Sequence, residues 1–203
     1  MEKNGVSIVF EYNEREIEGI EDFKKEIESS YHAEGQEMHL PAFSEGGEFI
    51  LKILLETDWN SFVKGALASG LLWDGIKIAG KSFVLKPLSD ALDKLFDQNK
   101  DGYGLKLVST SFLLEDRIIV MHGLSDNYKQ EFDTILHKIS TRAEQIEEEN
   151  CDDSIIDTIE FPYYYEKEND RYVEDSYIEP LGTPHLMKVV FKDGSCRYDE
   201  IEF

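Results

Sequence analysis

The chain has 203 residues and a formal net charge of −22, because 43 Asp and Glu residues outnumber 21 Lys and Arg residues. Hydrophobic residues make up 41% of the chain, which excludes intrinsic disorder and supports one domain with a sizeable core. The charge disfavours binding to nucleic acid or to an anionic membrane. It favours either a basic protein partner or a simple solvated acidic surface.

The excess of acidic residues is concentrated near the C-terminus. Residues 144–179 hold 14 acidic and two basic residues, and five tyrosines lie in the same stretch. Cys151 and Cys196 are far apart in the sequence and belong to no metal-binding pattern, so we expect reduced thiols. The first residues lack the long apolar run of a signal peptide, and we therefore expect a cytoplasmic protein.

The first quarter of the chain alternates short apolar and polar segments. Residues 6–12 are rich in β-formers and predict a strand, and residues 14–19 are a candidate for a short second strand. Residues 22–30 have the apolar spacing of a short amphipathic helix. Residues 32–47 are rich in Gly, Glu and His and predict a loop. Residues 48–56 predict either a buried strand or the first turns of a helix.

The longest apolar-rich segment follows, and Thr57 or Asp58 is suited to cap a helix at its start. We expect one long central helix that continues to about Leu85, where Pro87 forces a break. Ser89 is then expected to cap a second, shorter helix. Small residues recur along the central helix at a spacing of four, which lets another backbone approach closely. These sets are Ser61-Gly65-Ser69, Ala66-Gly70 and Gly75-Ala79.

The second half of the chain begins with a predicted β-hairpin, formed by residues 105–114 and 117–122. An amphipathic helix is predicted after it, with Ser125 or Asp126 as its cap. Its apolar stripe consists of Phe132, Ile135, Leu136, Ile139, Ala143 and Ile146.

The remaining segments complete the predicted fold. Residues 154–165 predict a strand, and residues 187–191 and 196–203 form the clearest hairpin of the chain. We therefore expect an α+β fold, with a mixed, mostly antiparallel sheet packed against the long small-residue-rich central helix and the second amphipathic helix. Residues 1–203 form a single domain in this prediction, with an acidic, Tyr-rich insertion at about 147–180.

One nucleotide-binding motif appears inside the central segment. Gly75, Gly80, Lys81 and Ser82 occupy the fixed positions of the phosphate-binding pattern GxxxxGK[ST]. In such a loop the lysine contacts the phosphates and the serine binds Mg²⁺. The bulky Ile-Lys-Ile-Ala interior and the nearby Pro87 disagree with that pattern, and a buried helix explains the same residues. A nucleotide-binding enzyme that uses residues 75–82 therefore remains an alternative hypothesis.

A second motif resembles the start of an EF-hand calcium loop. Asp97, Asn99 and Asp101 are followed by a glycine at the expected position, but the twelfth position is Val108 instead of Glu. A turn rich in Asn, Asp and Gly between a helix and a strand explains these residues more simply. We predict no metal and no cofactor, and keep calcium binding as the weaker alternative.

Membrane association is another alternative, through a helix over residues 61–85. The longest stretch of that segment without a charged residue runs from Gly65 to Trp73. It is far shorter than the ~20 residues that a membrane span needs, which leaves only an interfacial helix.

The leading hypothesis is a non-enzymatic, cytoplasmic binding or regulatory protein that engages a basic protein partner. An immunity protein, an antitoxin or a subunit of a defence or regulatory complex has this character. Tyrosine is enriched among the residues that dominate binding energy at interfaces, and an acidic surface attracts a basic one. The predicted partner-binding residues are Glu147, Glu148, Glu149, Tyr163, Tyr164, Tyr165, Tyr172 and Tyr177.

Overall fold

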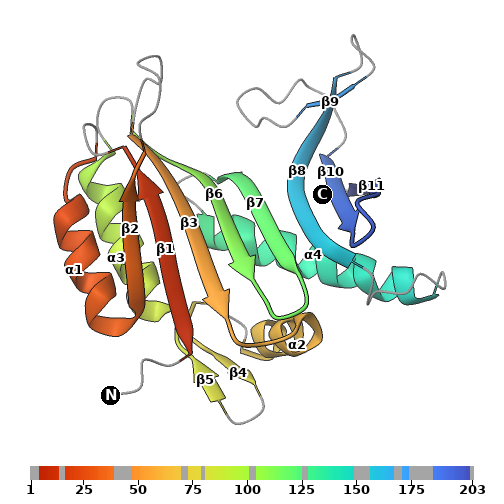
Figure 1. Ribbon diagram of the computed structural model, residues 1–203, viewed down its shortest axis with the longest axis horizontal. Coiled ribbons are helices and arrows are strands. Elements are labelled where there is room, and N and C mark those ends of the chain that lie inside the picture. The colour runs from red at the N-terminus through yellow and green to blue at the C-terminus, as the bar shows by residue number, and fades with distance from the viewer. Residues whose placement is uncertain are drawn as a thin grey trace.

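The computed structural model describes most of the chain. The ranges outside the description are 1–4, 14–16, 39–46, 70–72, 79–80, 101–103, 125–127, 149–155, 167–170, 174–184 and 202–203. Only the backbone is described at residues 69, 123–124, 141–148, 162–166, 171–173, 185–186 and 200–201. In the described part, helices and strands alternate along the chain and build one large sheet with a small separate hairpin (Figure 1).

The described residues form a main sheet of nine strands. In spatial order, eight of them are β2 (His32–Glu37), β1 (Val6–Tyr12), β3 (Gly47–Leu55), β6 (Leu105–Leu113), β7 (Ile118–Leu124), β8 (Ile156–Glu166), β10 (His185–Phe191) and β11 (Cys196–Ile201). The ninth, β9 (Arg171–Val173), pairs with β8. The separate hairpin consists of β4 (Ile76–Ile78) and β5 (Lys81–Phe83).

Parallel and antiparallel neighbours alternate over much of the main sheet. The parallel pairs are β1–β2, β3–β6 and β7–β8. The antiparallel pairs are β1–β3, β6–β7, β8–β9, β8–β10 and β10–β11. The predicted α+β class with a mixed, mainly antiparallel sheet is therefore confirmed.

The described helices pack against one face of this sheet. They are α1 (Ile20–Ser30), α2 (Trp59–Ser69), α3 (Lys86–Gln98) and α4 (Tyr128–Glu148). Along β1 and β3 every second residue is buried and the residues between are half-buried. Successive side chains of a strand point to opposite faces, so this alternation indicates one covered face and one helix-free face. Figure 1 shows the sheet from the helix-free side, with α4 crossing behind β6 and β7.

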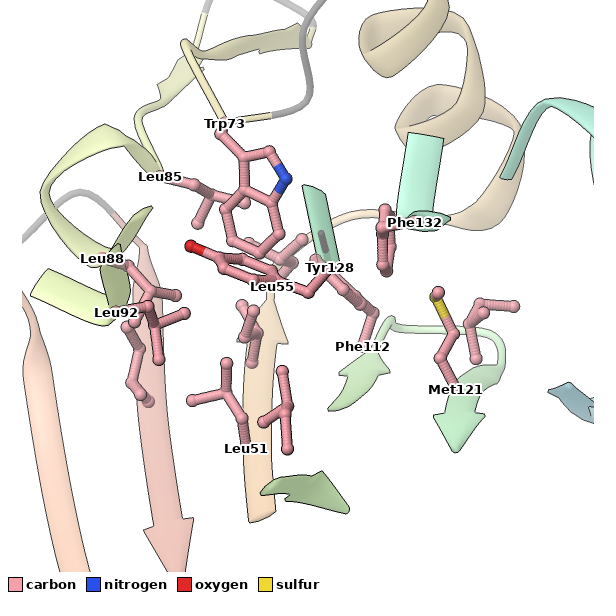
Figure 2. Packing of buried hydrophobic residues seen from close by; sticks show 14 of the residues in the cluster. Leu51, Leu55, Trp73, Leu85, Leu88, Leu92, Phe112, Met121, Tyr128 and Phe132 are labelled. Carbon is pink, nitrogen blue, oxygen red and sulfur yellow. The ribbon is translucent and has the colours of Figure 1, made fainter. Parts of the chain in front are cut away.

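The core lies between the covered face and the helices (Figure 2). The ring of Phe112 on β6 lies 4.6 Å from that of Phe132 on α4 and 5.4 Å from that of Phe62 on α2, measured between centroids. Trp73 meets Tyr128 edge to face at 5.5 Å. Aromatic pairs of this kind add about 0.5–1.5 kcal/mol each beyond the burial of their area. The cluster therefore joins α2, α4 and β6 into one unit.

Three helical connections join neighbouring parallel strands: β1–α1–β2, β3 to β6 through α2 and α3, and β7–α4–β8. The helices of all three connections lie on the same face of the sheet. Given the direction of each pair of parallel strands, the first two connections are right-handed and the third is left-handed (Figure 1). About 98% of such connections in proteins are right-handed. A right-handed third connection would place α4 over the face that is helix-free here.

The expected long central helix is wrong. Helix α2 ends at Ser69, and the chain then forms the β4–β5 hairpin. Gly75, with φ 136°, enters the hairpin in a conformation that L side chains rarely adopt, and the β-branched Ile76 and Ile78 favour a strand. At Gly65 the close neighbours are the side chains of Ile76 and Ile78 of the hairpin, and not the second backbone that we expected. Membrane association was expected to use one helix over residues 61–85, and the described part of that range has no such helix, because α2 ends at Ser69 and a hairpin follows.

Three smaller expectations also fail. Residues 32–37, expected in a loop, form the edge strand β2, because a strand at an edge needs only backbone pairing with β1 and tolerates polar side chains. Residues 17–19 precede α1 without forming a strand, and residues 14–16 lie outside the description. Pro87 lies in the first turn of α3, where a missing amide donor is tolerated, so Ser89 is not its cap.

The remaining predicted elements are confirmed. They are the strand at 6–12, the helices beginning near residues 22 and 128, the hairpin at 105–122, the strand that begins near residue 156 and the C-terminal hairpin. Of the two alternatives predicted for residues 48–56, the structure contains the strand, β3. Asp58 caps α2 as expected, since its carboxylate accepts a hydrogen bond from the Ser61 amide at 2.9 Å. That hydrogen bond lowers the pKa of the Asp58 carboxyl.

Replacing Gly65 should test how closely the hairpin packs on α2. A Cβ atom at Gly65 would lie 2.3 Å from Cγ2 of Ile76 and 2.9 Å from Cγ1 of Ile78. We expect Gly65→Ala to lower the free energy of unfolding by ~1–3 kcal/mol through overpacking, against a helix-propensity gain of ~1 kcal/mol. Urea denaturation measures the change, and Asn60→Ala at an exposed position of α2 is the control. A Gly65→Ala protein more stable than wild type would contradict this packing.

Tyr31 should make stability fall at alkaline pH. Its buried hydroxyl donates a hydrogen bond to the Val84 carbonyl at 2.8 Å and accepts one from the Leu88 amide at 3.3 Å. Burial raises the pKa of Tyr31 to about 12, against ~10 for an unfolded chain. In the unfolded state the Tyr31 hydroxyl therefore loses its proton at a lower pH than in the folded state. The contribution of Tyr31 to the free energy of unfolding is complete below pH ~10 and is lost as pH rises towards ~12.

The measurement for Tyr31 is urea denaturation of wild type and Tyr31→Phe at several pH values between about 8 and 11. We expect the variant to be ~1–2 kcal/mol less stable at the lower pH, because two buried backbone groups lose their partner. The stability of Tyr31→Phe should also fall less steeply with rising pH than that of wild type. Tyr198→Phe is the control. An unchanged alkaline slope in Tyr31→Phe would show that other groups cause it.

Candidate functional site

A row of aliphatic side chains crosses the helix-free face. Leu54 of β3 is in register with Leu113 of β6, and Leu113 with Ile118 of β7. Thr158 of β8 and Val190 of β10 continue the same register. All five side chains are half-buried. We call Leu54, Leu113, Ile118 and Val190 the aliphatic row, because they form a partly exposed apolar strip at right angles to the strands.

Charged side chains lie beside the row in paired groups. On β1 and β3, Lys52 Nζ lies 2.6 Å from Glu11 Oε1. On β7, β8 and β10, Glu160 lies between His122 Nε2 at 3.6 Å and Lys188 Nζ at 3.3 Å. The Glu160 side chain is only 16% exposed. Covering these groups with a partner would lower the local dielectric constant and strengthen their attractions.

A hollow of about 940 Å³ adjoins the row where β3 and β6 end. Besides Leu54 and Leu113, its lining includes polar side chains from four segments: His32, Glu56, Lys81 with Ser82, and Glu115. Lys81 Nζ lies 3.2 Å from Glu56 Oε2, and both side chains are about two-thirds exposed. An exposed pair of this kind contributes little to stability, so either partner is free to exchange it for another charge.

The phosphate-binding pattern does not form a phosphate loop. A working loop joins a strand directly to a helix and points its amides inward. Here Gly75 precedes β4, Lys81 and Ser82 belong to β5, and the next helix begins only at Lys86. Gly80 lies outside the described residues. Lys81 and Ser82 instead reach the surface of the hollow.

The calcium-like motif holds the end of α3 in place. Asn99 Oδ1 accepts a hydrogen bond from the Glu18 amide at 2.8 Å, and Asn99 Nδ2 donates to the carbonyls of Glu18 and Leu95, both at 2.8 Å. This amide group is buried, and its oxygen and both of its N–H groups have partners within the fold, which indicates a structural role. Asp97 is exposed, and Asp101 lies outside the description. Among the described residues, no group of three or more His, Cys, Asp or Glu side chains is placed to hold a metal.

The predicted partner-binding residues are divided between the two ends of β8. The members with a described backbone are Glu147, Glu148, Tyr163, Tyr164, Tyr165 and Tyr172. The two glutamates form the end of α4, which precedes β8 in the chain, whereas β9 lies at the far end of β8 (Figure 1). Tyr165 of β8 is in register with Tyr172 of β9. Glu149 and Tyr177 lie outside the described residues.

Sequence reasoning missed the aliphatic row and the hollow. The strands that carry them were predicted, but a run such as Ile118–Met121 is apolar on both faces, so its period does not show which side chains meet helices. The available signal was Ser109 and Ser111, two polar residues that alternate along β6 on the helix-free face. Only the register between strands brings Leu54, Leu113 and Ile118 into one line.

Comparison of the chain with protein-family models, with curated proteins and with solved structures found no match. In the described part of the chain, none of the helices has the length and apolar character needed to cross a membrane.

Asn99 should be a structural residue. We expect Asn99→Ala to lower the free energy of unfolding by ~2–3 kcal/mol, because the buried carbonyl of Leu95 and the partly buried amide and carbonyl of Glu18 lose their partners. Asp97→Ala, the control at an exposed position of the same motif, should be within ~0.5 kcal/mol of wild type. Thermal melts of wild type in calcium and in chelator should coincide. A calcium-dependent rise in melting temperature that Asp97→Ala abolishes would contradict this assignment.

Proposed function

We propose that the protein is a non-enzymatic binding or regulatory protein that engages a protein partner with a basic surface. The formal net charge of −22 supports a cationic partner, since opposite potentials steer association and disfavour partners of like charge. An immunity protein, an antitoxin or a cytoplasmic subunit of a defence or regulatory complex fits this description.

Ion pairing within the chain leaves the net acidic charge of its surface unchanged, because each pair neutralises one lysine and one carboxylate. Many described lysines already have a carboxylate within 4 Å: Lys24, Lys25, Lys52, Lys81, Lys86, Lys94, Lys100, Lys129 and Lys188. A paired lysine and carboxylate are together nearly neutral at a distance. The acidic residues in excess therefore determine the potential that an approaching protein meets.

The observation that carries the proposal is the helix-free face. Helices cover one face of the sheet, and on the other face the aliphatic row stays half-buried next to partly desolvated charges such as Glu160. A contiguous apolar strip rimmed by polar groups is typical of a surface that another protein covers. It gives this acidic protein a defined place for contact, in addition to a general attraction for cations.

The acidic stretch near the C-terminus is a second contact region in this proposal. Helix α4 carries Glu147 and Glu148 in its last turn and no basic residue there. Carboxylates are unfavourable at the negative end of a helix dipole, so a partner's cation would be stabilised at this position. The tyrosines of β8 and β9 add side chains of a type that is enriched at interfaces.

Salt-dependent binding tests the proposal. The protein, immobilised through a terminal tag, is incubated with cell lysate at about 50 mM and about 500 mM salt, and retained proteins are identified. We expect retained proteins to be basic and to dissociate at the higher salt concentration. Neutralising Glu147, Glu148 and Glu149 to Gln should weaken retention of the same proteins.

The matched control removes the same charge elsewhere, with Asp22, Asp74 and Asp97 replaced by Asn at exposed positions. We expect this variant to retain the partner better than the glutamate variant does. Retention only of acidic or neutral proteins, or retention unaffected by salt, would contradict a basic partner.

A further inference from the structure

We propose that the aliphatic row and the adjoining hollow bind one amphipathic, basic helix of a partner protein. The inference rests on the proposed function and names the surface and the kind of segment that it accepts. Three features carry it: the direction of the row, its length, and the carboxylates along both of its sides.

The direction of the row favours a helix over an added strand. The row runs across the strands through Leu54, Leu113 and Ile118, whereas an added strand pairs with a sheet edge and lies along the strands. Along β3 and β6 the apolar positions are interrupted by Lys52 and Ser111. A helix presents an apolar stripe, with residues three and four apart, that can lie along this row, in which Thr158 of β8 is the polar position between Ile118 and Val190.

The length of the row suits a short helix. From Leu54 on β3 to Val190 on β10 there are four steps between neighbouring strands. At about 4.8 Å for each step the row is about 19 Å long. An α-helix rises about 1.5 Å per residue, so about 13 residues cover it.

Carboxylates border the row on both sides. Glu56 and Glu115 lie at the ends of β3 and β6, in the lining of the hollow, and both are exposed. Glu160 lies on the opposite side of the row, next to Lys188. A helix with lysines or arginines flanking its apolar stripe would place cations near both borders. The exposed ion pair between Glu56 and Lys81 can be replaced by a pair between Glu56 and a cation of the partner helix at little cost in free energy.

The same charges argue against a second copy of this chain as the occupant. Each copy carries a formal charge of −22, so two identical acidic faces repel each other. The half-buried lysines on the face, Lys52 and Lys188, are already paired with Glu11 and Glu160. The face therefore has little positive charge to offer to another copy.

The experiment uses a synthetic, amidated peptide of about 15 residues, with leucines on one helical face and lysines on the rest. Two control peptides carry Ser in place of every Leu, or Glu in place of every Lys. Binding to the full-length protein is measured by isothermal titration and is mapped by backbone NMR shifts. We expect saturable binding of the first peptide alone, with the largest shifts at the aliphatic row and at Glu56, Glu115 and Ser82.

A pair of variants sharpens the test. Ile118→Lys places a cation in the middle of the row and should weaken peptide binding about tenfold or more. The control, Leu67→Lys, changes an exposed leucine of α2, which is 47% exposed, and should bind as wild type does. Circular dichroism checks that both variants fold. If one of them does not, the NMR map of the wild-type protein still tests the location of the binding site.

Several outcomes would overturn the inference. Shifts confined to residues 147–180, or equal binding of the leucine-free peptide, would mean that charge alone attracts the peptide; the proposed function would then stand without this site. A dimer that sedimentation detects and Ile118→Lys disrupts would assign the row to a second copy. No binding of any basic peptide at low salt would remove both this inference and the basic partner.

Discussion

The packing of α4 on the covered face of β6 and β7 is the interaction on which the rest of the structure depends. Phe132 contacts Phe112 of β6, and Tyr128 stacks on Phe96 of α3, with ring centroids 5.5 Å apart. The Tyr128 hydroxyl also donates a hydrogen bond to the Ser89 carbonyl of α3 at 3.2 Å. Burial of one such large side chain is worth about 1.5–3 kcal/mol. A single helix thus ties the middle of the sheet to α3 and to Trp73, which precedes the hairpin.

This packing also explains the left-handed connection. On the covered face, β6, β7 and β8 present mainly large apolar side chains, such as Phe112, Ile119 and Phe161, with Thr110 as a buried polar exception. On the other face the same strands present Ser109, Ser111 and Glu160. The apolar stripe of α4 gains far more on the first face, and that gain outweighs the general preference for right-handed connections. The helix-free face is the direct consequence.

The surface that results combines two features that lie apart in the sequence. The aliphatic row comes from four strands, and the hollow beside it is closed by the β4–β5 hairpin, whose position depends on the absence of a side chain at Gly65. The acidic residues around them are in excess over the lysines, many of which are already paired. An apolar strip in an acidic surface suits a ligand that is both apolar and basic, and so it favours a protein segment over a nucleic acid or an anionic membrane.

The sequence by itself determined the α+β class, most strands, the helix that begins near residue 128 and the acidic character, because these depend on local periodicity and on composition. It did not determine residues 75–83, where the apolar pattern predicts part of a helix although Ile76 and Ile78 favour a strand, and where the packing of these side chains on Gly65 is a tertiary contact. It also did not distinguish the two faces of β7, whose residues are apolar on both. The register of β3, β6, β7 and β10 and the hand of the β7–α4–β8 connection exist only in the tertiary structure. They decided which face stays free of helices, because contacts between distant segments determine where α4 buries its apolar stripe.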